Sequence, residues 1–354
     1  MISVFRPITA QDVSEALKII SQDNCRFSIK GHGHAPAAGF ANAEGGVTID
    51  LTTLSSVSLN KDSTVASVDA GAKWLDIYRH LSRAGVQVAG GLNGNVGVGG
   101  LLLGGGISHF TTRIGWACDQ VLNYQDNHAD LFVALKGGGN NFGVVTRFDL
   151  QTFPAKLFET FTNLLDSSTY DPLASLVTTL VYSTTSKSWS LKSSAVYTKP
   201  VTHLESLLMR KIRHHSTFRP SSENMREVFD TLNKTIYTFN PHGGVTWDIA
   251  FEPLVAGMLN SSKDRNVLGL KAAEEGYIVL ISALWPNSTV DSSIESTARA
   301  KFTYLNYAAP YQEPLKSLSK AERRFLRATS QKYDPEQILQ RKVGEFKLQT
   351  CQEV

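Results

Sequence analysis

The spacing of hydrophobic residues predicts alternating helices and strands in the N-terminal part of the chain. A helix is predicted after Thr9, because apolar side chains then recur at helical spacing, at Val13, Ala16, Leu17, Ile19 and Ile20. Short runs with alternating faces predict strands at 27–30, 46–51 and 64–70, and helical spacing returns at 74–84. This mixture is typical of a domain built from both helices and sheets.

The middle of the chain, up to about residue 320, also mixes the two patterns. Strands are predicted at 188–197 and 277–285, and helices near 168–182, 203–214 and 222–233. Strands grouped with helices in this way predict an α+β layer, in which helices cover one face of an antiparallel sheet. An amphipathic helix follows at 319–329, and the chain then ends in a short strand-like segment. A chain of 354 residues is too long for one ordinary core, so two domains, or one domain with a large insertion, are expected.

Glycine is concentrated in the N-terminal part, in clusters at 31–33, 90–106 and 137–143. Each glycine weakens a regular element by about 0.5–1 kcal/mol, so such clusters need a reason. The commonest reason is close approach of the backbone to a ligand, with N–H groups directed at phosphate. Loops and tight turns would explain any single cluster better, but three clusters in one domain favour the ligand.

The glycine spacing excludes two common nucleotide-binding motifs. The segment from Val98 to Gly104 does not follow the Gly-x-Gly-x-x-Gly pattern of a Rossmann fold, and no Gly-Lys-Ser/Thr sequence of a phosphate-binding loop is present. The composition excludes further classes of partner. A net charge of +3, from 35 basic and 32 acidic residues, argues against nucleic acid. The cysteines (Cys25, Cys118 and Cys351) are too far apart to predict a metal site.

No apolar run approaches the ~20 residues that cross a bilayer, so no membrane partner is expected. No secretory signal is visible at the N-terminus. The pattern leaves the localisation open.

Six motifs stand in order along the chain. They are Lys30-Gly-His-Gly-His-Ala-Pro36, Gly45-Gly-Val-Thr-Ile-Asp50, the stretch from Val96 to Ser108, Gly115-Trp-Ala-Cys-Asp119, the stretch from Asp130 to Thr146, and Lys332-Tyr-Asp-Pro-Glu336. Together they closely resemble the berberine-bridge-enzyme-like FAD-linked oxidoreductases of the fungal type. The resemblance implies the vanillyl-alcohol-oxidase fold, with a two-part FAD-binding domain of the PCMH type. The implied domains are 1–155 for FAD, 156–320 for the substrate, and a segment 321–354 that returns to the FAD domain.

The resemblance also implies how FAD is held. In the family, the histidine that ends an Arg-x-Gly-Gly-His motif is bonded to the 8α-methyl group of the flavin, and His34 matches it. Lys30 replaces the usual arginine and His32 the usual glycine. Residues that match the cofactor-binding loops are Gly31, Gly33, Gly97, Gly99, Gly100 and Ser108, with Asn141, Gly143 and Val144 near the adenine end. Asn93 stands where many relatives have a second linking cysteine, so a single covalent link is expected.

A flavin oxidase needs a base that takes a proton from the substrate as hydride leaves. The segment Phe302–Pro310 resembles the family's Asn-Tyr motif, which makes Tyr307 the expected catalytic base, with Asn306 beside it. Packing of an aromatic ring in the sheet is the competing interpretation of Tyr307. Weaker candidates for the pocket wall, each expected to be core residues, are His109, Trp247, Trp285 and Tyr304. The expected substrate is a small alcohol or amine of secondary metabolism or a sugar-like alcohol, and molecular oxygen is the expected reoxidant.

The chain also departs from the family pattern. Relatives, which are often secreted, begin with extra sequence, and they carry a strand-turn-strand between the positions of Asn123-Tyr124 and Asp130 that this chain lacks. The middle domain is also shorter around 208–210 and before Lys301. Loss of a hairpin would leave open sheet edges and an incomplete cleft. An inactive remnant with a binding role is therefore the alternative to an oxidase, while a UDP-sugar reductase fits His34 and the Tyr-Asp-Pro motif less well.

Overall fold

The computed structural model divides the chain into two compact units. Unit 1 comprises Met1–Ala155, Met258–Lys271 and Phe302–Val354, and unit 2 comprises Lys156–Gly257 and Ala272–Lys301. The residues that the structure describes are 3–23, 25–35, 39–123, 128–154, 174–183, 188–197, 246–254, 259, 266–270, 276–284, 304–308 and 312–348. Residues 302–320, which the sequence pattern groups with the substrate domain, thus belong to unit 1.

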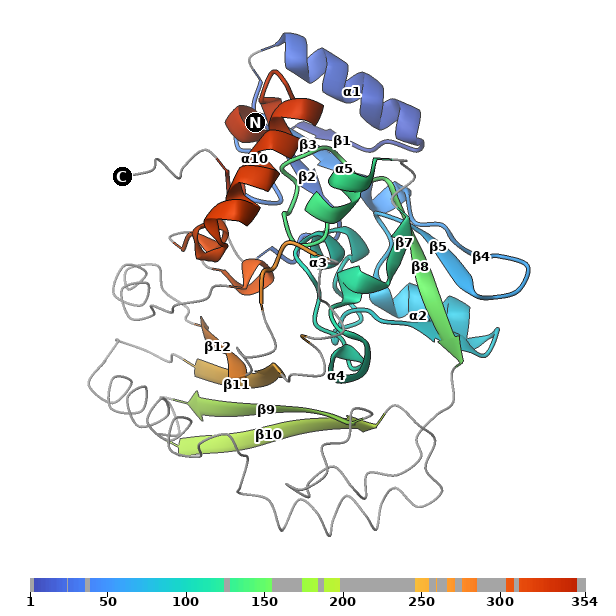
Figure 1. Cartoon of the computed structure of the whole chain (residues 1–354), viewed down its shortest axis with the longest axis vertical. Helices are drawn as coiled ribbons and strands as arrows, with labels where there is room; N and C mark the ends of the chain where they lie inside the picture. The colour runs from blue at the N-terminus through green and yellow to red at the C-terminus, as the bar shows by residue number, and fades with distance from the viewer. Residues whose placement is uncertain are drawn as a thin grey trace. The chain divides into compact units, whose positions relative to one another are not determined.

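A small parallel sheet forms one part of unit 1. Its order is β1 (Ser3–Phe5), β3 (Val47–Asp50) and β2 (Phe27–Lys30), and helix α1 (Ala10–Gln22) lies along it (Figure 1). The predicted N-cap is confirmed, because the Thr9 side chain accepts a hydrogen bond from the Asp12 N–H and the Asp12 carboxylate accepts one from the Thr9 N–H. Val13 and Ile20 point into the core.

The second sheet of unit 1 is antiparallel. Its order is β4 (Val57–Leu59), β5 (Val65–Asp69), β8 (Arg147–Pro154) and β6 (Val86–Val88). Helix α2 (Trp74–Ser82) supplies the fully buried side chains of Trp74, Ile77 and Leu81. These side chains share one core cluster with Phe148 of β8. The predicted strands at 27–30, 46–51 and 64–70 and the helix at 74–84 are therefore confirmed, apart from their ends.

β7 (Val121–Asn123) also pairs with β8, just before the position where the resemblance implies that a hairpin is missing. The pairing covers Val121 and Asn123 with an irregular register, and α5 (Ala129–Ala134) begins soon afterwards. Leu122 is 48% exposed on this short strand. The chain between β6 and β7 forms α3 (Val98–Leu103), α4 (Thr111–Ile114) and the 3-10 turn η2 (Ala117–Gln120).

Unit 2 contains the antiparallel sheet that the sequence predicted. Its order is β10 (Ser188–Tyr197), β9 (Ala174–Ser183), β11 (Thr246–Leu254) and β12 (Gly276–Leu284). The predicted helix at 168–182 is wrong from residue 174 onward, because that segment is β9. Its β-branched run Val177-Thr-Thr-Leu-Val181 favours a strand, and β9 pairs with a neighbour on each side. The predicted helices at 203–214 and 222–233 lie outside the described residues.

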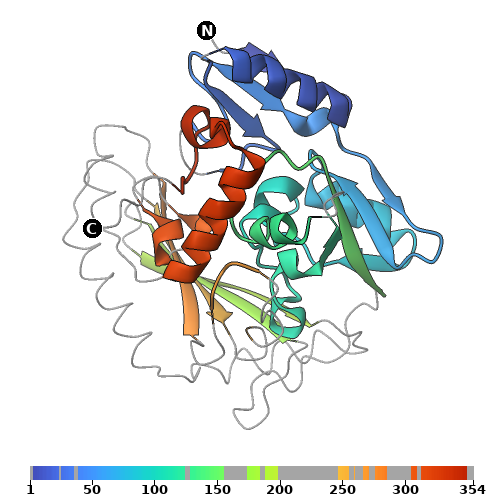
Figure 2. The ribbon, with the colours of Figure 1, turned by 45° about the horizontal axis from the view of Figure 1, so that its top comes forward.

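The C-terminal part of unit 1 begins with the turns η6 (Leu305–Tyr307) and η7 (Pro314–Ser317), followed by α10 (Lys320–Tyr333) and α11 (Ile338–Lys342). The predicted strand-like end is wrong for 338–342, where the structure has a helix. Among the described residues from 343 to 348, only Val343 has strand geometry, in a parallel bridge to Phe27 of β2. α10 thus returns beside the N-terminal elements, as Figures 1 and 2 show. Among the described helices, none has both the length and the apolar character to cross a bilayer.

Candidate cofactor and active site

The segment that carries His34 leaves the end of β2 as a tight turn. Gly33 has a φ of +69°, a left-handed conformation that favours glycine, and a Cβ there would lie 3.4 Å from Cε of Lys30. His34 follows in an exposed position. Within the described part of the chain, its imidazole forms no hydrogen bond or ion pair. His34 is therefore open to a ligand.

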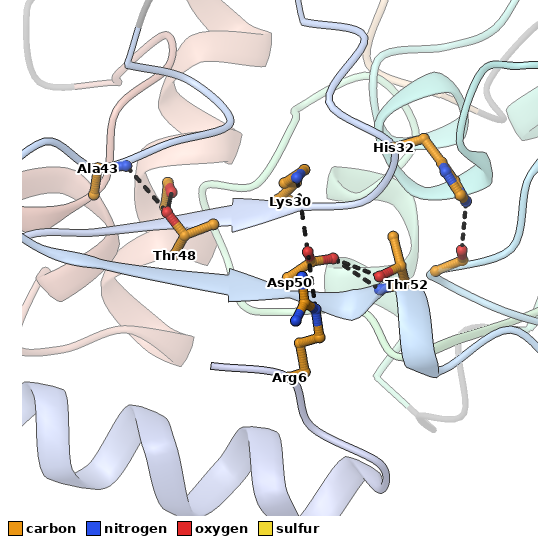
Figure 3. A network of polar contacts seen from close by, with 9 residues as sticks. Arg6, Lys30, His32, Ala43, Thr48, Asp50 and Thr52 are labelled. Carbon is orange, nitrogen blue, oxygen red and sulfur yellow. Dashed lines mark hydrogen bonds and ion pairs between the residues drawn. The ribbon is translucent and has the colours of Figure 1, made fainter. Parts of the chain in front are cut away.

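Lys30 is held at the base of this turn by Asp50, as Figure 3 shows. Asp50 Oδ2 lies 3.7 Å from Nζ of Lys30 and 3.5 Å from Nε of Arg6. Burial opposes ionisation of Asp50, but hydrogen bonds from the hydroxyl and N–H of Thr52, together with the two cations, leave its pKa below the ordinary value. The Lys30 ammonium thus fastens β2 to β3 at the start of the His34 turn.

His32 fastens the same turn from the other side. Its Nε2 lies 2.9 Å from the carbonyl oxygen of Gly71 (Figure 3), and because a carbonyl only accepts, Nε2 carries the proton. Gly71 has no room for a side chain, since a Cβ would lie 1.7 Å from the backbone oxygen of Leu51. This role of His32 was not predicted from the sequence, because no motif signals the contact.

The glycine-rich stretch 90–106, here called the first glycine loop, meets the His34 turn directly. A Cβ on Gly97 would lie 3.0 Å from the backbone nitrogen of His32. A Cβ on Gly99 or on Gly31 would lie 3.3 Å or 3.8 Å from the same atom, the backbone oxygen of Ala70. The structure thus brings together the predicted residues Gly31, Gly97 and Gly99. Gly100 beside them is exposed, with open space where a Cβ would stand.

Asn93, at the expected place of a second flavin link, is exposed and forms a local turn. Its Oδ1 accepts a hydrogen bond from the N–H of Asn95 at 2.9 Å. An amide has no nucleophile able to form the link that a cysteine forms. The chemistry of Asn93 therefore leaves His34 as the candidate for covalent attachment in this loop region.

The opposite end of α3 meets the segment of Tyr307. Nδ2 of Asn306 donates a hydrogen bond to the backbone oxygen of Leu101 at 3.0 Å. Gly104 is required beside it, because a Cβ would lie 1.9 Å from Oδ1 of Asn306. Asn306 and Tyr307 are both half-buried. Asn306, one member of the expected catalytic pair, is therefore fixed against α3.

Tyr304 forms the buried floor of this segment. Its hydroxyl accepts hydrogen bonds from the N–H of Gly106 at 2.8 Å and from Nδ2 of Asn306 at 3.0 Å. The Tyr304 ring lies 5.2 Å from the Trp116 ring and meets the Tyr307 ring edge-on at 4.9 Å. The expectation that Tyr304 is a core residue agrees with its 4% exposure, but its hydroxyl also joins three parts of the site.

The glycine cluster 137–143, here called the second glycine loop, packs on the same end of α3. The N–H groups of Gly137 and Gly139 both donate to the backbone oxygen of Leu103 at 3.0 Å. Asn140 in this loop is 6% exposed, and within the described part of the chain neither its Oδ1 nor its Nδ2 has a hydrogen-bond partner. A buried amide left in this way costs free energy unless a partner outside the chain engages it. Gly143 nearby faces open space.

The side-chain amide of Asn141, unlike that of Asn140, is hydrogen-bonded within the described part of the chain. Its Nδ2 donates to the backbone oxygens of Gly138 and Phe346 at 2.8 and 3.2 Å, and its Oδ1 accepts from Gln340 at 2.8 Å. The side chain that the sequence assigned to the cofactor thus ties the loop to the C-terminal segment. Val144 packs against the core.

Ser108 is also used internally. It is 1% exposed, and its Oγ accepts a hydrogen bond from the N–H of Phe110 and lies 3.3 Å from Oγ1 of Thr111. Asn141 and Ser108 can therefore shape the cofactor loops, and their own side-chain groups are already occupied.

Among the remaining wall candidates, the structure describes the side chain of His109. Burial lowers the pKa of His109, and its neighbours in the chain begin α4. Trp285 and the side chain of Trp247 lie outside the described residues. No group of three or more His, Cys, Asp or Glu side chains suited to a metal ion occurs among the residues described.

These features fit a bound dinucleotide. Open backbone at Gly100 and Gly143 leaves room that side chains would fill, and the Asn140 amide lacks a partner. His34, Gly31 and Gly97 lie at one end of α3, and Asn306, Tyr307 and the second glycine loop lie at the other.

The sequence comparisons agree with this geometry. The FAD binding domain family matches residues 2–125. An FAD-dependent monooxygenase from Cochliobolus heterostrophus is 29% identical over 436 residues, covering 96% of this chain and 82% of the relative. Since that aligned stretch is longer than the 354 residues of this chain, the relative has internal residues that this chain lacks.

Solved structures share the fold. The 6-hydroxy-D-nicotine oxidase from Arthrobacter nicotinovorans superposes with a TM-score of 0.72 at 18% identity, covering 97% of this chain and 91% of that one. A structure of berberine bridge enzyme gives a TM-score of 0.76 at 14% identity, covering 98% of this chain and 91% of the other. At such low identities, these similarities concern the fold.

Proposed function

Because the chain is a berberine-bridge-enzyme-like FAD-linked oxidoreductase, we propose that it oxidises a C–H bond next to a hydroxyl or amine of a small molecule, with FAD bonded to His34. When bound, FAD supplies the hydride acceptor, its N5 atom. The proposed substrate class is a small molecule of secondary metabolism. A sugar-like alcohol is the alternative substrate class.

The observation that carries this proposal is the arrangement around α3. The His34 turn contacts its N-terminal end through Gly97, and Asn306 binds the backbone of its C-terminal half. A helix of six residues rises about 9 Å, a span that a single cofactor can bridge. The linking histidine and the proposed base therefore lie within reach of one flavin.

Tyr307 is the proposed general base. It accepts the proton of the substrate hydroxyl or amine as the hydride leaves the neighbouring carbon. An ordinary tyrosine has a pKa of about 10, so a base near neutral pH needs a neighbouring positive charge or dipole. The edge-on contact with Tyr304 fixes the orientation of the Tyr307 ring. Molecular oxygen is the proposed final electron acceptor.

A second candidate function, binding without catalysis, is favoured by β7. This strand makes only a short, irregular pairing with β8, where relatives have a further hairpin. If the cleft is incomplete there, the chain would bind a ligand and not turn it over. His34, the glycine loops and the fixed Asn306 favour the oxidase.

Oxygen consumption tests the oxidase directly. The purified chain, supplied with FAD during expression, is mixed with a panel of primary and secondary alcohols and amines, including oligosaccharides. The oxidase predicts oxygen uptake with at least one probe, and bleaching of the visible flavin band by the same probe without oxygen. The catalytic proposal is contradicted if no probe bleaches the flavin-loaded wild type and the Tyr307→Phe variant behaves identically. That result would favour the binding function.

A further inference from the structure

The amide of Asn306 has a defined orientation. The atom that faces Leu101 must be the nitrogen, because the backbone oxygen of Leu101 only accepts hydrogen bonds. The same nitrogen donates to the hydroxyl of Tyr304 at 3.0 Å. Both N–H groups of the amide are therefore used within the protein.

The other end of the amide, Oδ1, is left as an acceptor. It forms no hydrogen bond within the part of the chain that the structure describes, and Asn306 is only half-buried. Oδ1 lies against Gly104, where the absence of a Cβ makes the position possible. Asn306 can thus offer a ligand an acceptor and no donor.

Tyr304 maintains this orientation. Its hydroxyl is fixed by the N–H of Gly106, and its ring is held between Trp116 and Tyr307. Turning the Asn306 amide over would place two acceptors, Oδ1 and the Leu101 oxygen, against each other. It would also remove the donor that the Tyr304 hydroxyl now receives.

We propose that Asn306 Oδ1 accepts a hydrogen bond from an N–H of the flavin ring, and that Tyr304 is the positioning residue that aims it. The inference rests on the proposed function, since it requires flavin beside Tyr307. An oxidised flavin ring presents mostly acceptors along its edges and few N–H donors. An acceptor-only side chain therefore selects one edge of the ring and fixes its register against Tyr307.

The test compares substrate-free, flavin-loaded proteins by visible absorbance and flavin midpoint potential. Tyr304→Phe keeps the ring contacts and removes only the hydroxyl. Asn306→Ala removes the acceptor. Asn306→Ser, a second variant, keeps an acceptor on a shorter side chain. The matched control is Tyr333→Phe, which removes a hydroxyl bonded to Asp130 at 2.8 Å.

Tyr304→Phe and Asn306→Ala should shift the absorbance maximum and the potential in the same direction, and Tyr333→Phe should leave both at the wild-type values. Since Tyr304 acts through Asn306, adding Tyr304→Phe to Asn306→Ala should produce no further shift. Loss of flavin from a folded Tyr304→Phe protein, with flavin retained in Tyr333→Phe, also supports the role.

Wild-type spectra and potentials in all the site variants would overturn the inference, as would additive shifts in the double variant. A change confined to turnover, with the flavin signals unchanged, would overturn it too, because it would assign Oδ1 to the substrate. A wild-type protein without flavin would instead refute the proposed function, on which the inference depends. The two failures are therefore distinguishable.

Discussion

The imidazole of His32 donates a hydrogen bond of 2.9 Å to the carbonyl oxygen of Gly71, and so fixes the turn on which His34 stands. A His32→Ala variant should lower the free energy of unfolding by about 0.5–1.5 kcal/mol, the usual net value of one hydrogen bond. The freed turn should also load less flavin, measured as the ratio of visible to protein absorbance.

The control for His32 is His80→Ala, which removes an exposed imidazole from α2. It should leave both stability and flavin loading unchanged. Equal flavin loading in His32→Ala and the wild type would show that the turn holds its position without this contact.

The substitution Gly100→Ala should change protein stability and cofactor binding in opposite directions. Gly100 lies inside α3 with open space where a Cβ would stand, so Gly100→Ala should raise the stability of the cofactor-free fold by about 0.5–1 kcal/mol. The same methyl group should obstruct the cofactor and reduce flavin loading. Thermal unfolding in a His34→Ala background and flavin loading in the wild-type background measure the two effects. Higher stability with full loading would place the flavin away from Gly100.

A substitution at Asn140 should also stabilise the cofactor-free protein, here because it removes a buried polar group. The buried amide of Asn140 has no hydrogen-bond partner in the described part of the chain, so Asn140→Leu should stabilise the cofactor-free protein by about 1–3 kcal/mol. The neighbouring variant Asn141→Leu is the matched control and should destabilise it, because three hydrogen bonds are lost. Denaturant unfolding of both variants gives the signs, and two variants of the same sign would contradict this interpretation.

Asp130 should contribute to resistance against acid. Hydrogen bonds from Lys332 and Tyr333 lower the pKa of Asp130 to about 2. Since the pKa in the unfolded chain is about 3.9, the stabilisation is present above that pH and is lost as the pH falls toward 2. Asp130→Asn should therefore move the acid-unfolding midpoint, followed by circular dichroism, to higher pH. Asp62→Asn, an exposed acid on the turn before β5, should not move it.

The sequence predicted the elements whose signals are local. The Thr9 cap, the stripe that buries Val13 and Ile20, and the helix starting at Trp74 follow from spacing alone, and the structure confirms them. The strand β9 was missed because one of its pairing partners, β11, lies far away in sequence, and because pairing with β11 and with the adjoining β10 overrides the local helical spacing.

The candidate site divides in the same way. Family motifs placed His34 and Gly97 in adjoining loops, and the structure brings these loops together. The roles of His32, Tyr304 and Asn140 could not be predicted, because each depends on one partner, or on the lack of one, in the folded chain. Asn141 showed the converse, since its side chain is occupied by the C-terminal segment.

Retention of flavin after acid denaturation is the decisive measurement for the bond between FAD and His34. The full chain, purified folded and then precipitated in acid, should keep its yellow colour in the protein pellet, whereas His34→Ala should release its colour into the supernatant. Colour that washes out of the wild-type pellet would contradict the bond to His34. A folded wild type with no visible flavin band would contradict the assignment of an FAD-dependent oxidase.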